Sequence, residues 1–300
     1  MTVEQSFGPM ERHAAQTLIT MALMEDLGDR GDLTCQALIP ADRRAEVNVV
    51  SRKPGVLSAS PIGRMVFSQL DNAIQWKALK SDGDRLQPGD VIATVSGPLN
   101  ALLVGERTML NFMTHLSGIA SLTAQFVERI AGTRAVILDT RKTLPGYRRL
   151  EKYAVRCGGG TNHRMGLFDG VLIKDNHLAA WTANASIAAA VKTAREQSPP
   201  GVSVEVEVDT LDQLRDALQG RPDIVLLDNM PPGMMREAVA IRDAAGQGVL
   251  LEASGGVTLD TVRAIAETGV ERISIGGLTH SAPALDLAFD WKEPEDAFVI

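Results

Sequence analysis

The sequence predicts an α/β protein: an incomplete parallel α/β barrel that follows an N-terminal α+β sandwich domain. Two observations predict this fold. After Gly132, short apolar runs alternate with helical segments at the spacing of successive βα units in a parallel sheet. Before Leu99, apolar and polar residues alternate between turn signals, as in antiparallel strands. Six runs are typical of barrel strands, fewer than the eight of a closed barrel, and they begin near Val136, Val171, Val202, Ile224, Val249 and Ile273.

Composition limits the class of protein. The chain has 300 residues, 45% of them apolar, which suits a barrel with an attached smaller domain. The net charge of −7, with two tyrosines and three tryptophans, argues against nucleic acid as a partner. No apolar run reaches the length of a membrane span, and residues 1–16 lack the pattern of a signal peptide. Cys35 and Cys157 lie far apart and are expected to be free thiols, so we expect a cytoplasmic protein without a membrane partner.

The first segments predict the N-terminal domain, residues 1–115. Pro9 is expected to begin a helix that Gly28 ends. Residues 45–57 alternate and then turn at Lys53-Pro54-Gly55, which predicts an antiparallel hairpin. A short helix over 61–70 and further strands over 74–95, separated by Asp-Gly-Asp and Pro-Gly-Asp turns, complete an antiparallel sheet with helices on one side.

Residues 99–131 predict two helices, interrupted near Ser117-Gly118. In the first helix Arg107 falls on an apolar stripe between Leu103 and Leu110. An arginine there needs a partner. The pattern favours a side chain that reaches the edge of the stripe or pairs with a core carboxylate, ahead of one that contacts a ligand.

The barrel domain is predicted over residues 116–280. Its helices are expected over 183–197, 212–219, 233–245 and 259–268. The tail, residues 281–300, contains Leu285, Leu287 and Phe289 and is expected to leave the barrel and pack on the N-terminal layer.

One basic stretch, Arg134–Lys174, stands out in this acidic chain. It contains nine Lys or Arg against three acids, a local balance of +6. Two apolar runs expected as strands bracket it, and each ends directly in charged residues, Asp139-Thr140-Arg141-Lys142 and Lys174-Asp175-Asn176-His177. Because a solvated basic face would not sit at the ends of core strands, the stretch predicts a pocket for a small polyanion.

The working face of a parallel barrel lies at the carboxyl ends of its strands. Glu207 and Asp228 end neighbouring strands there, which suits Mg²⁺, although ion pairs with nearby lysines are a fair alternative. His163 and Arg164 follow a glycine run in a loop that feeds this face, and this context favours function for His163 over a structural role. Two glycine turns on the last two strands favour phosphate binding over plain tight turns: Ser254, Gly255 and Gly256, and Gly276 and Gly277.

Together these residues resemble quinolinate phosphoribosyltransferase over nearly the whole chain. The resemblance rests on blocks that occur in this order: Asp139–Thr143 with Pro145-Gly146, Gly158–Gly160 with Asn162-His163-Arg164, Leu172–His177, Glu205–Asp209, Leu227–Asn229 and Ser254–Gly256. The family has an N-terminal α/β sandwich and an incomplete α/β barrel, and it works as a homodimer or a multiple of dimers. It converts quinolinate and phosphoribosyl pyrophosphate into nicotinate mononucleotide, pyrophosphate and CO₂, a step of NAD biosynthesis.

The resemblance implies a role for each candidate residue. Quinolinate would be bound by Arg141, His163, Arg164 and Lys174, with Arg107 contributed by the partner subunit of a homodimer. Thr140 and Lys142 would face pyrophosphate, and Glu207 and Asp228 would hold Mg²⁺ and the ribose hydroxyls. The two turns would bind the 5′-phosphate through Ser254, Gly255, Gly256, Ile275, Gly276 and Gly277. Among these, Lys142, Lys174, Glu207 and Asp228 are the expected catalytic residues.

Three other functions stay open from the sequence. Lys174 at a strand end could form a Schiff base, as in a lyase or aldolase. The chain could instead bind a phosphorylated ligand without catalysis, which would leave Glu207, Asp228 and the excess of cations unexplained. Within the family resemblance, a pyridine monocarboxylate such as nicotinate is the competing acceptor.

Overall fold

A computed structural model describes residues 6–181, 186–246 and 248–291. The chain divides into two compact units. Unit 1 comprises Met1–Ala124, Thr143–Gly159 and Thr279–Ile300, and unit 2 comprises Gln125–Lys142 and Gly160–Leu278. Each unit has its own sheet, and the fold class expected from the sequence, a parallel sheet with helices beside a separate antiparallel layer, is confirmed.

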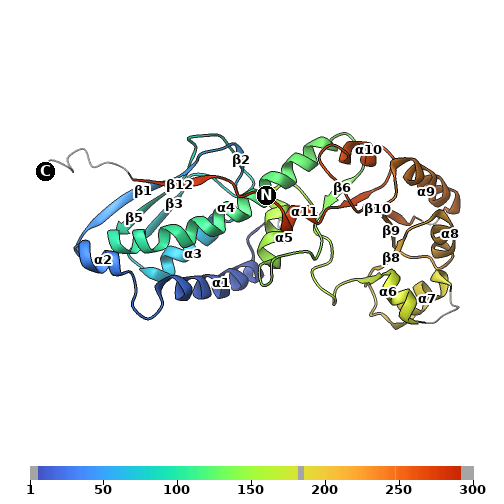
Figure 1. Cartoon of the computed structure of the whole chain (residues 1–300), viewed down its shortest axis with the longest axis horizontal. Coiled ribbons are helices and arrows are strands. Elements are labelled where there is room, and N and C mark those ends of the chain that lie inside the picture. The colour runs from blue at the N-terminus through green and yellow to red at the C-terminus, as the bar shows by residue number, and fades with distance from the viewer. Residues whose placement is uncertain (1–5, 182–185, 247, 292–300) are drawn as a thin grey trace. The chain divides into compact units, whose positions relative to one another are not determined.

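Unit 1 is built on a four-stranded antiparallel sheet in the order β12-β1-β5-β3 (Figure 1). Its strands are β1 (Arg44–Ser51), β3 (Gln75–Ala78), β5 (Val91–Pro98) and β12 (Leu287–Trp291). In the register of β1 and β12, Val49 lies opposite Phe289, so the end of the described chain completes the first sheet. The Phe289 ring stacks on Phe67 of helix α3 (Ser60–Leu70), with 5.9 Å between the ring centroids.

The predicted hairpin over residues 45–57 is wrong. Strand β1 pairs with β5 and β12, whereas β2 (Gly55–Val56) pairs with β4 (Arg85–Leu86) in a separate two-stranded ribbon. The turn at Pro54 therefore redirects the chain from one sheet to another. Alternation marks a strand, but it does not identify the strand's partner.

The helices of unit 1 follow local signals. Helix α1 (Pro9–Leu27) begins at a proline and ends at Gly28, as expected. Three others were not expected or are short: α2 (Leu33–Leu38), whose N-terminus Asp32 caps, α5 (Arg148–Cys157) and α11 (Gly277–His280). Buried apolar residues of α1 and α5, such as Ile19 and Leu150, belong to the core of this unit.

Helix α4 (Leu99–Arg129) is one continuous helix of 31 residues, so the predicted interruption near Gly118 is wrong. A side chain at Gly118 would collide with the backbone oxygen of Pro283. The glycine permits close packing of the returning chain on the helix. A glycine in a helical pattern marks either a break or a close approach, and only packing separates these two cases.

Unit 2 contains the predicted parallel sheet of six strands, in the order β6-β11-β10-β9-β8-β7. Every neighbouring pair is parallel, so all six carboxyl ends lie along one edge. The strands are β6 (Val136–Leu138), β7 (Val171–Ile173), β8 (Val204–Val208), β9 (Ile224–Asp228), β10 (Leu250–Ser254) and β11 (Arg272–Ser274).

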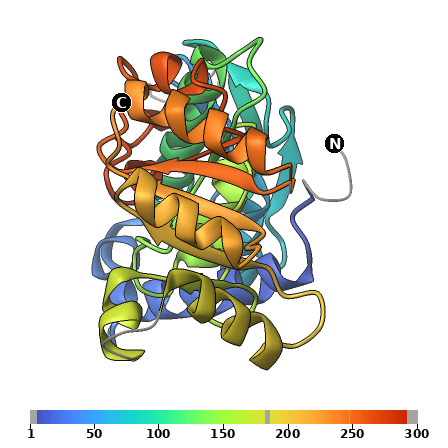
Figure 2. The ribbon, with the colours of Figure 1, turned by 90° about the vertical axis from the view of Figure 1, so that its right-hand side faces the viewer.

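Helices line one face of this sheet. Helices that follow one another in the chain pack side by side, and Figure 2 shows these helices in front of the strands. They are α7 (Ile187–Gln197), α8 (Leu211–Gln219), α9 (Pro232–Ala245) and α10 (Val262–Ala266), close to their predicted ranges. Residues 183–185 of the first predicted helix lie outside the described residues. A further helix, α6 (Asp175–Trp181), directly follows β7 and was not expected.

Among the described residues, no helix is long and apolar enough to cross a membrane.

Candidate active site

The carboxyl edge of the parallel sheet gathers most of the predicted site residues. Arg141 and Lys142 follow β6, Lys174 follows β7, Asp228 and Ser254 end β9 and β10, and Ile275–Gly277 follow β11. Strand register also places several carboxylates on one face. Glu207 and Glu252 both lie opposite Leu226, and Glu205 and Asp228 are each two residues from a member of that row. This face therefore carries four carboxylates beside Ile224, Leu226 and Leu250.

The structure divides the basic stretch between the two units. Thr143–Gly159 belongs to unit 1, where Lys152 is buried in α5 and Arg156 pairs with Glu11 at 3.1 Å. The first residue of the glycine run, Gly158, ends α5, because its N–H donates a hydrogen bond to the Ala154 carbonyl oxygen. Four cations of the stretch remain at the carboxyl edge in unit 2: Arg141, Lys142, Arg164 and Lys174.

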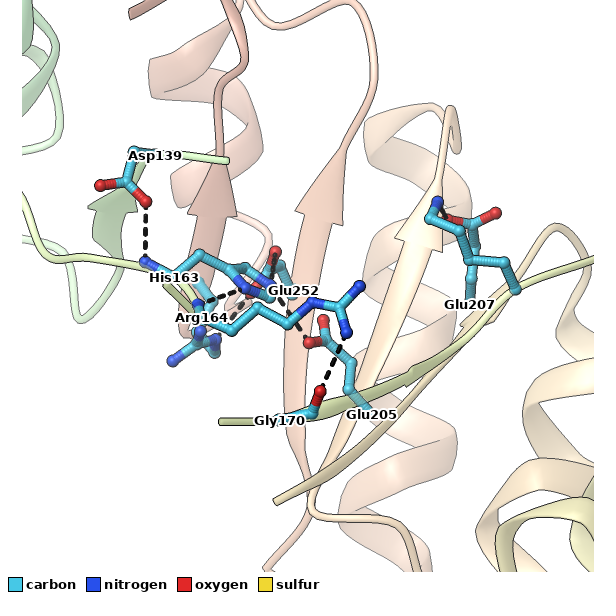
Figure 3. A network of polar contacts seen from close by, with 9 residues as sticks. Asp139, His163, Arg164, Gly170, Glu205, Glu207 and Glu252 are labelled. Carbon is cyan, nitrogen blue, oxygen red and sulfur yellow. Dashed lines mark hydrogen bonds and ion pairs between the residues drawn. The ribbon is translucent and has the colours of Figure 1, made fainter. Parts of the chain in front are cut away.

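His163 lies among buried charged groups. Its Nε2 is 3.1 Å from Glu205 Oε2 and 3.4 Å from Glu252 Oε1. Glu252 is fully buried, and its other oxygen accepts a 2.7 Å hydrogen bond from Arg272 Nε. Figure 3 shows the His163 ring turned toward Glu205, which belongs to β8, and Glu252, which belongs to β10.

Burial and pairing act in opposite directions on these groups. Burial alone would lower the pKa of His163, but its hydrogen bonds to Glu205 and Glu252 raise it to about 9. The Arg164 N–H, 2.7 Å from Nδ1, works against this rise, because Nδ1 accepts only when it carries no proton. Burial raises the pKa of Glu205, whereas at Glu252 the effect of burial is outweighed by His163 and Arg272, and its pKa is lowered.

The segment around His163 is held at its backbone as well. Asp139, which is buried at the end of β6, accepts hydrogen bonds from the His163 N–H at 2.9 Å and from Asn162 Nδ2 at 2.5 Å. Arg164 donates from Nη1 to the Gly170 oxygen at 2.9 Å. Burial and the nearby charge of Arg141 lower the pKa of Arg164. Two guanidinium groups held this close favour an anion between or beside them.

Lys174 forms an ion pair with Glu207. The Lys174 side chain remains 44% exposed and the Glu207 side chain 12%, so the lysine faces solvent from above a nearly buried carboxylate. Asp228, half-buried on the next strand, accepts a 2.7 Å hydrogen bond from Asn229 Nδ2. The expected alternative for Glu207, an ion pair with a neighbouring lysine, is therefore present in the structure.

The glycine turns differ from the predicted arrangement. Gly255 and Gly256 both adopt positive φ, and a side chain at Gly255 would collide with Asn229. The following helix, α10, begins only at Val262 and has five residues, so it does not place its N-terminus at this turn. The exposed backbone of Gly255 and Gly256 is what remains available to a phosphate.

Arg107 belongs to the part of α4 that lies in unit 1. Its side chain is 69% exposed and lies 4.0 Å from Glu106, so it is not on the buried stripe to which the helical pattern assigned it. The neighbouring buried positions are Thr108, Met109 and Leu110.

Four charged residues of this region were given no role from the sequence: Asp139, Glu205, Glu252 and Arg272. A signal for Glu205 was present, because Glu205 and Glu207 alternate in a strand whose other residues are valines. Strand alternation places both on one face. For Glu252 and Arg272, only the pairing of β10 with β11 reveals that they are neighbours.

Comparison with known proteins agrees with this geometry. Sequence models described as "Quinolinate phosphoribosyl transferase, N-terminal domain" and "C-terminal domain" match residues 32–117 and 119–290. A probable carboxylating nicotinate-nucleotide pyrophosphorylase of Bacillus subtilis is 44% identical, covering 91% of this chain and 92% of its own length. A carboxylating nicotinate-nucleotide pyrophosphorylase of Mycobacterium leprae is also 44% identical, covering 93% and 98%.

A solved structure extends the likeness to three dimensions. The nicotinate-nucleotide pyrophosphorylase from Francisella tularensis superposes with a TM-score of 0.87 at 39% identity, covering 93% of this chain and 96% of the other. Two family models together match most of the sequence, and the relatives align over nearly their whole length. The chain therefore belongs to the quinolinate phosphoribosyltransferase family.

Proposed function

We propose that this chain transfers the phosphoribosyl group of phosphoribosyl pyrophosphate to quinolinate with loss of CO₂. The products are nicotinate mononucleotide and pyrophosphate, and the step belongs to NAD biosynthesis. The observation that supports the proposal most directly is the cluster of cations at the carboxyl edge of a parallel sheet, in a chain of net charge −7. Membership of the family, whose relatives are named for this reaction, supports the same activity.

The two substrates explain the number of cations. Quinolinate is a dianion and phosphoribosyl pyrophosphate carries several negative charges, so bringing them together is electrostatically costly. A close cation–anion pair offsets roughly 4 kcal/mol at an effective dielectric constant near 20. In the proposal Arg141, Arg164 and Lys174 bind the dicarboxylate. The Arg164 guanidinium donates one hydrogen bond, from Nη1 to the Gly170 oxygen. Its remaining N–H groups would form the planar pair of donors that binds a carboxylate.

The other residues serve the transfer itself. As the C–O bond to pyrophosphate breaks, negative charge grows on the leaving group, and Lys142, exposed at the end of β6, is placed to stabilise it together with the Thr140 hydroxyl. Bond formation to the ring nitrogen makes that nitrogen quaternary. The adjacent carboxylate then leaves as CO₂, the electron pair remains on the carbon next to N⁺, and a proton taken up by that carbon completes nicotinate mononucleotide. Much of the drive for decarboxylation therefore resides in the substrate.

Mg²⁺ is part of the proposal. Glu207 and Asp228 suit it, because both are carboxylates that lie on one face of neighbouring strands and both keep some exposure. When bound there with the substrate phosphates, Mg²⁺ supplies charge neutralisation for the leaving group. The chain itself would supply two carboxylates as ligands. Glu207 would then contact the ion in place of Lys174, its ion-pair partner in the structure.

The proposal includes a homodimer, alone or as the building block of a higher oligomer. The exposed Arg107 would complete the dicarboxylate pocket of the partner subunit. A cytoplasmic location also belongs to the proposal, and the free thiols Cys35 and Cys157 agree with a reducing compartment. Analytical ultracentrifugation and cell fractionation test these two statements.

One alternative is weakened by the structure. A Schiff-base lysine must be a free amine at some stage, whereas Lys174 is held in an ion pair with Glu207. Nicotinate as the acceptor is the stronger competitor, because it differs from quinolinate by one carboxylate. Arg141, Arg164 and Lys174 together provide more positive charge than a monocarboxylate needs.

A direct assay tests the proposal. The protein is incubated with phosphoribosyl pyrophosphate, Mg²⁺ and either quinolinate labelled in its 2-carboxylate or nicotinate. We expect nicotinate mononucleotide and labelled CO₂ in equal amounts from quinolinate, and little product from nicotinate. Equal or faster turnover of nicotinate would contradict the assigned acceptor, and trapping of a carbonyl substrate by borohydride would favour the lyase.

A further inference from the structure

Two buried carboxylates have no part in the proposed reaction. Glu205 is 3% exposed and Glu252 is fully buried, on the face of the sheet that bears the predicted substrate residues. Burying two ionised carboxylates is costly unless each is paired. Their partners are His163, which contacts both, and Arg272, which contacts Glu252. The two acids, His163 and Arg272 form a buried group in which the His163 ring carries its hydrogen on Nε2, toward the carboxylates, because Nδ1 accepts from the Arg164 N–H.

Both ring nitrogens of His163 already face the protein. Nε2 points to Glu205 and Glu252, and Nδ1 lies 2.7 Å from the Arg164 main-chain nitrogen. The His163 side chain is 11% exposed, so little of it is open to a ligand. The next residue, Arg164, extends toward Gly170 and remains half-buried. The His163 ring is therefore enclosed by protein atoms, whereas the charge of the neighbouring Arg164 can still reach a ligand.

The same group could be considered as a metal site, because the ligand atoms of His163, Glu205 and Glu252 all lie within 4.8 Å of one another. A cation there would have to replace the hydrogen that Nε2 shares with the carboxylates. It would also lie beside the Arg272 guanidinium, 2.7 Å from Glu252. Repulsion from Arg272 disfavours a metal, whereas two carboxylates around one imidazole suit hydrogen bonding.

We propose that Glu205 and Glu252 are positioning residues of the quinolinate pocket, which hold the His163 ring by its Nε2 so that His163 fixes the backbone at Arg164. This inference rests on the proposed function. In this inference His163 positions Arg164, and the carboxylates of the substrate are bound by Arg164 and the cations beside it. Asp139 supports the same segment from the other side through the His163 N–H.

Isosteric variants test the inference. Glu205→Gln and Glu252→Gln remove the charge but keep the volume. The matched control is Glu271→Gln, because Glu271 also pairs with an arginine, Arg242 at 2.9 Å, but accepts the Leu251 N–H at the amino edge of the sheet as its other contact. We expect Glu205→Gln to raise the KM for quinolinate by about tenfold or more, the loss expected for one charged hydrogen bond. The KM for phosphoribosyl pyrophosphate should change less than twofold, and the control should change neither KM.

Nitrogen-15 NMR of labelled histidine gives a second measurement that needs no catalysis. We expect the His163 ring signals to shift in Glu205→Gln and Glu252→Gln but not in Glu271→Gln. Saturating quinolinate should leave the His163 ring signals of the wild type nearly unchanged. A large change at Nδ1 on adding quinolinate would show direct contact and overturn the positioning role.

Other outcomes also decide the question. A wild-type KM for quinolinate in Glu205→Gln and Glu252→Gln, or an equal rise in KM for both substrates, would contradict the inference. If the wild type forms no product from quinolinate, the proposed function fails instead, and the NMR comparison still reports whether the two carboxylates hold His163. A variant that fails to fold is replaced by Glu205→Asp. Its carboxylate keeps the charge but lies farther from His163 Nε2, so the KM for quinolinate should rise by an intermediate amount.

Discussion

The two edges of the parallel sheet in unit 2 use similar residues for different purposes. At the amino edge, Glu271 accepts hydrogen bonds from Arg242 and from the Leu251 N–H, and Asp223 accepts from Arg195 and from the Val204 N–H. Carboxylates there complete the ends of strands. Further along the strands, on the face that carries the predicted site residues, Glu205, Glu207 and Glu252 instead hold basic side chains. The comparison shows that carboxylates complete strand ends at the amino edge, whereas on the face of the proposed site they pair with basic side chains.

The strongest test of the carboxyl edge combines Lys174→Ala with Arg107→Ala. Each variant alone should lose nearly all activity, on the order of a hundredfold or more in kcat/KM, because each removes a cation from the pocket. Subunits of the two variants are then mixed and exchanged. In a symmetric dimer with Arg107 acting across the interface, roughly a quarter of the sites should regain activity.

The mixing experiment has a clear negative outcome. Subunit exchange is verified first with differently tagged chains. If activity stays at the level of the single variants after exchange, Arg107 does not act in the partner's pocket, although the rest of the carboxyl edge is unaffected by that result.

The second test replaces one arginine at each edge by lysine. Arg164→Lys should weaken quinolinate binding by roughly 2–5 kcal/mol, because an ammonium cannot reproduce the planar fork that binds a carboxylate. Arg195→Lys at the amino edge is the control, since its ion pair with Asp223 is 43% exposed and should contribute little. Binding is measured by calorimetry. Equal effects of the two substitutions would remove the functional distinction between the edges.

The third test uses pH and His163. The pKa of His163 in the folded protein is raised to about 9 from its ordinary value of 6.5, so protonation of His163 stabilises the folded state below pH 6.5, and this contribution is lost as pH rises toward 9. We expect the free energy of unfolding to fall by up to about 3 kcal/mol more in the wild type than in His163→Gln over this range. Urea unfolding at several pH values measures it. Parallel pH profiles would show that the carboxylates do not hold a protonated ring.

The smallest effect is expected at the amino edge. Glu271→Gln should lower the free energy of unfolding by about 1–2 kcal/mol, because it weakens the hydrogen bonds to Arg242 and to the Leu251 N–H. Activity at saturating substrate should not change. Thermal unfolding and steady-state kinetics of the same preparation provide the measurement, and a loss of activity without a loss of stability would sharpen the search for function at that edge.

Much of the fold and of the site was accessible from local patterns. The six strand runs and the charged residues that follow them are properties of short segments, so their positions near Val171 and Lys174, or Ile224 and Asp228, were predicted closely. The assignment of catalytic and binding roles came from the family resemblance and stays a prediction. The site residues that the sequence reasoning missed, such as Glu252, are those whose neighbours come from other strands.

By itself, the sequence determined the six strands of the parallel sheet and the helices that alternate with the later ones, that the carboxyl ends of these strands are rich in charge, and to which family the chain belongs. These follow from residue periodicity and from contiguous motifs. Tertiary structure alone decided that β1 pairs with β12, that Gly118 lies within one helix, that half of the basic stretch belongs to the other unit, and that His163 is enclosed by Glu205 and Glu252. The physical reason is that pairing, burial and the ionisation of a buried group depend on neighbours that are distant in the chain.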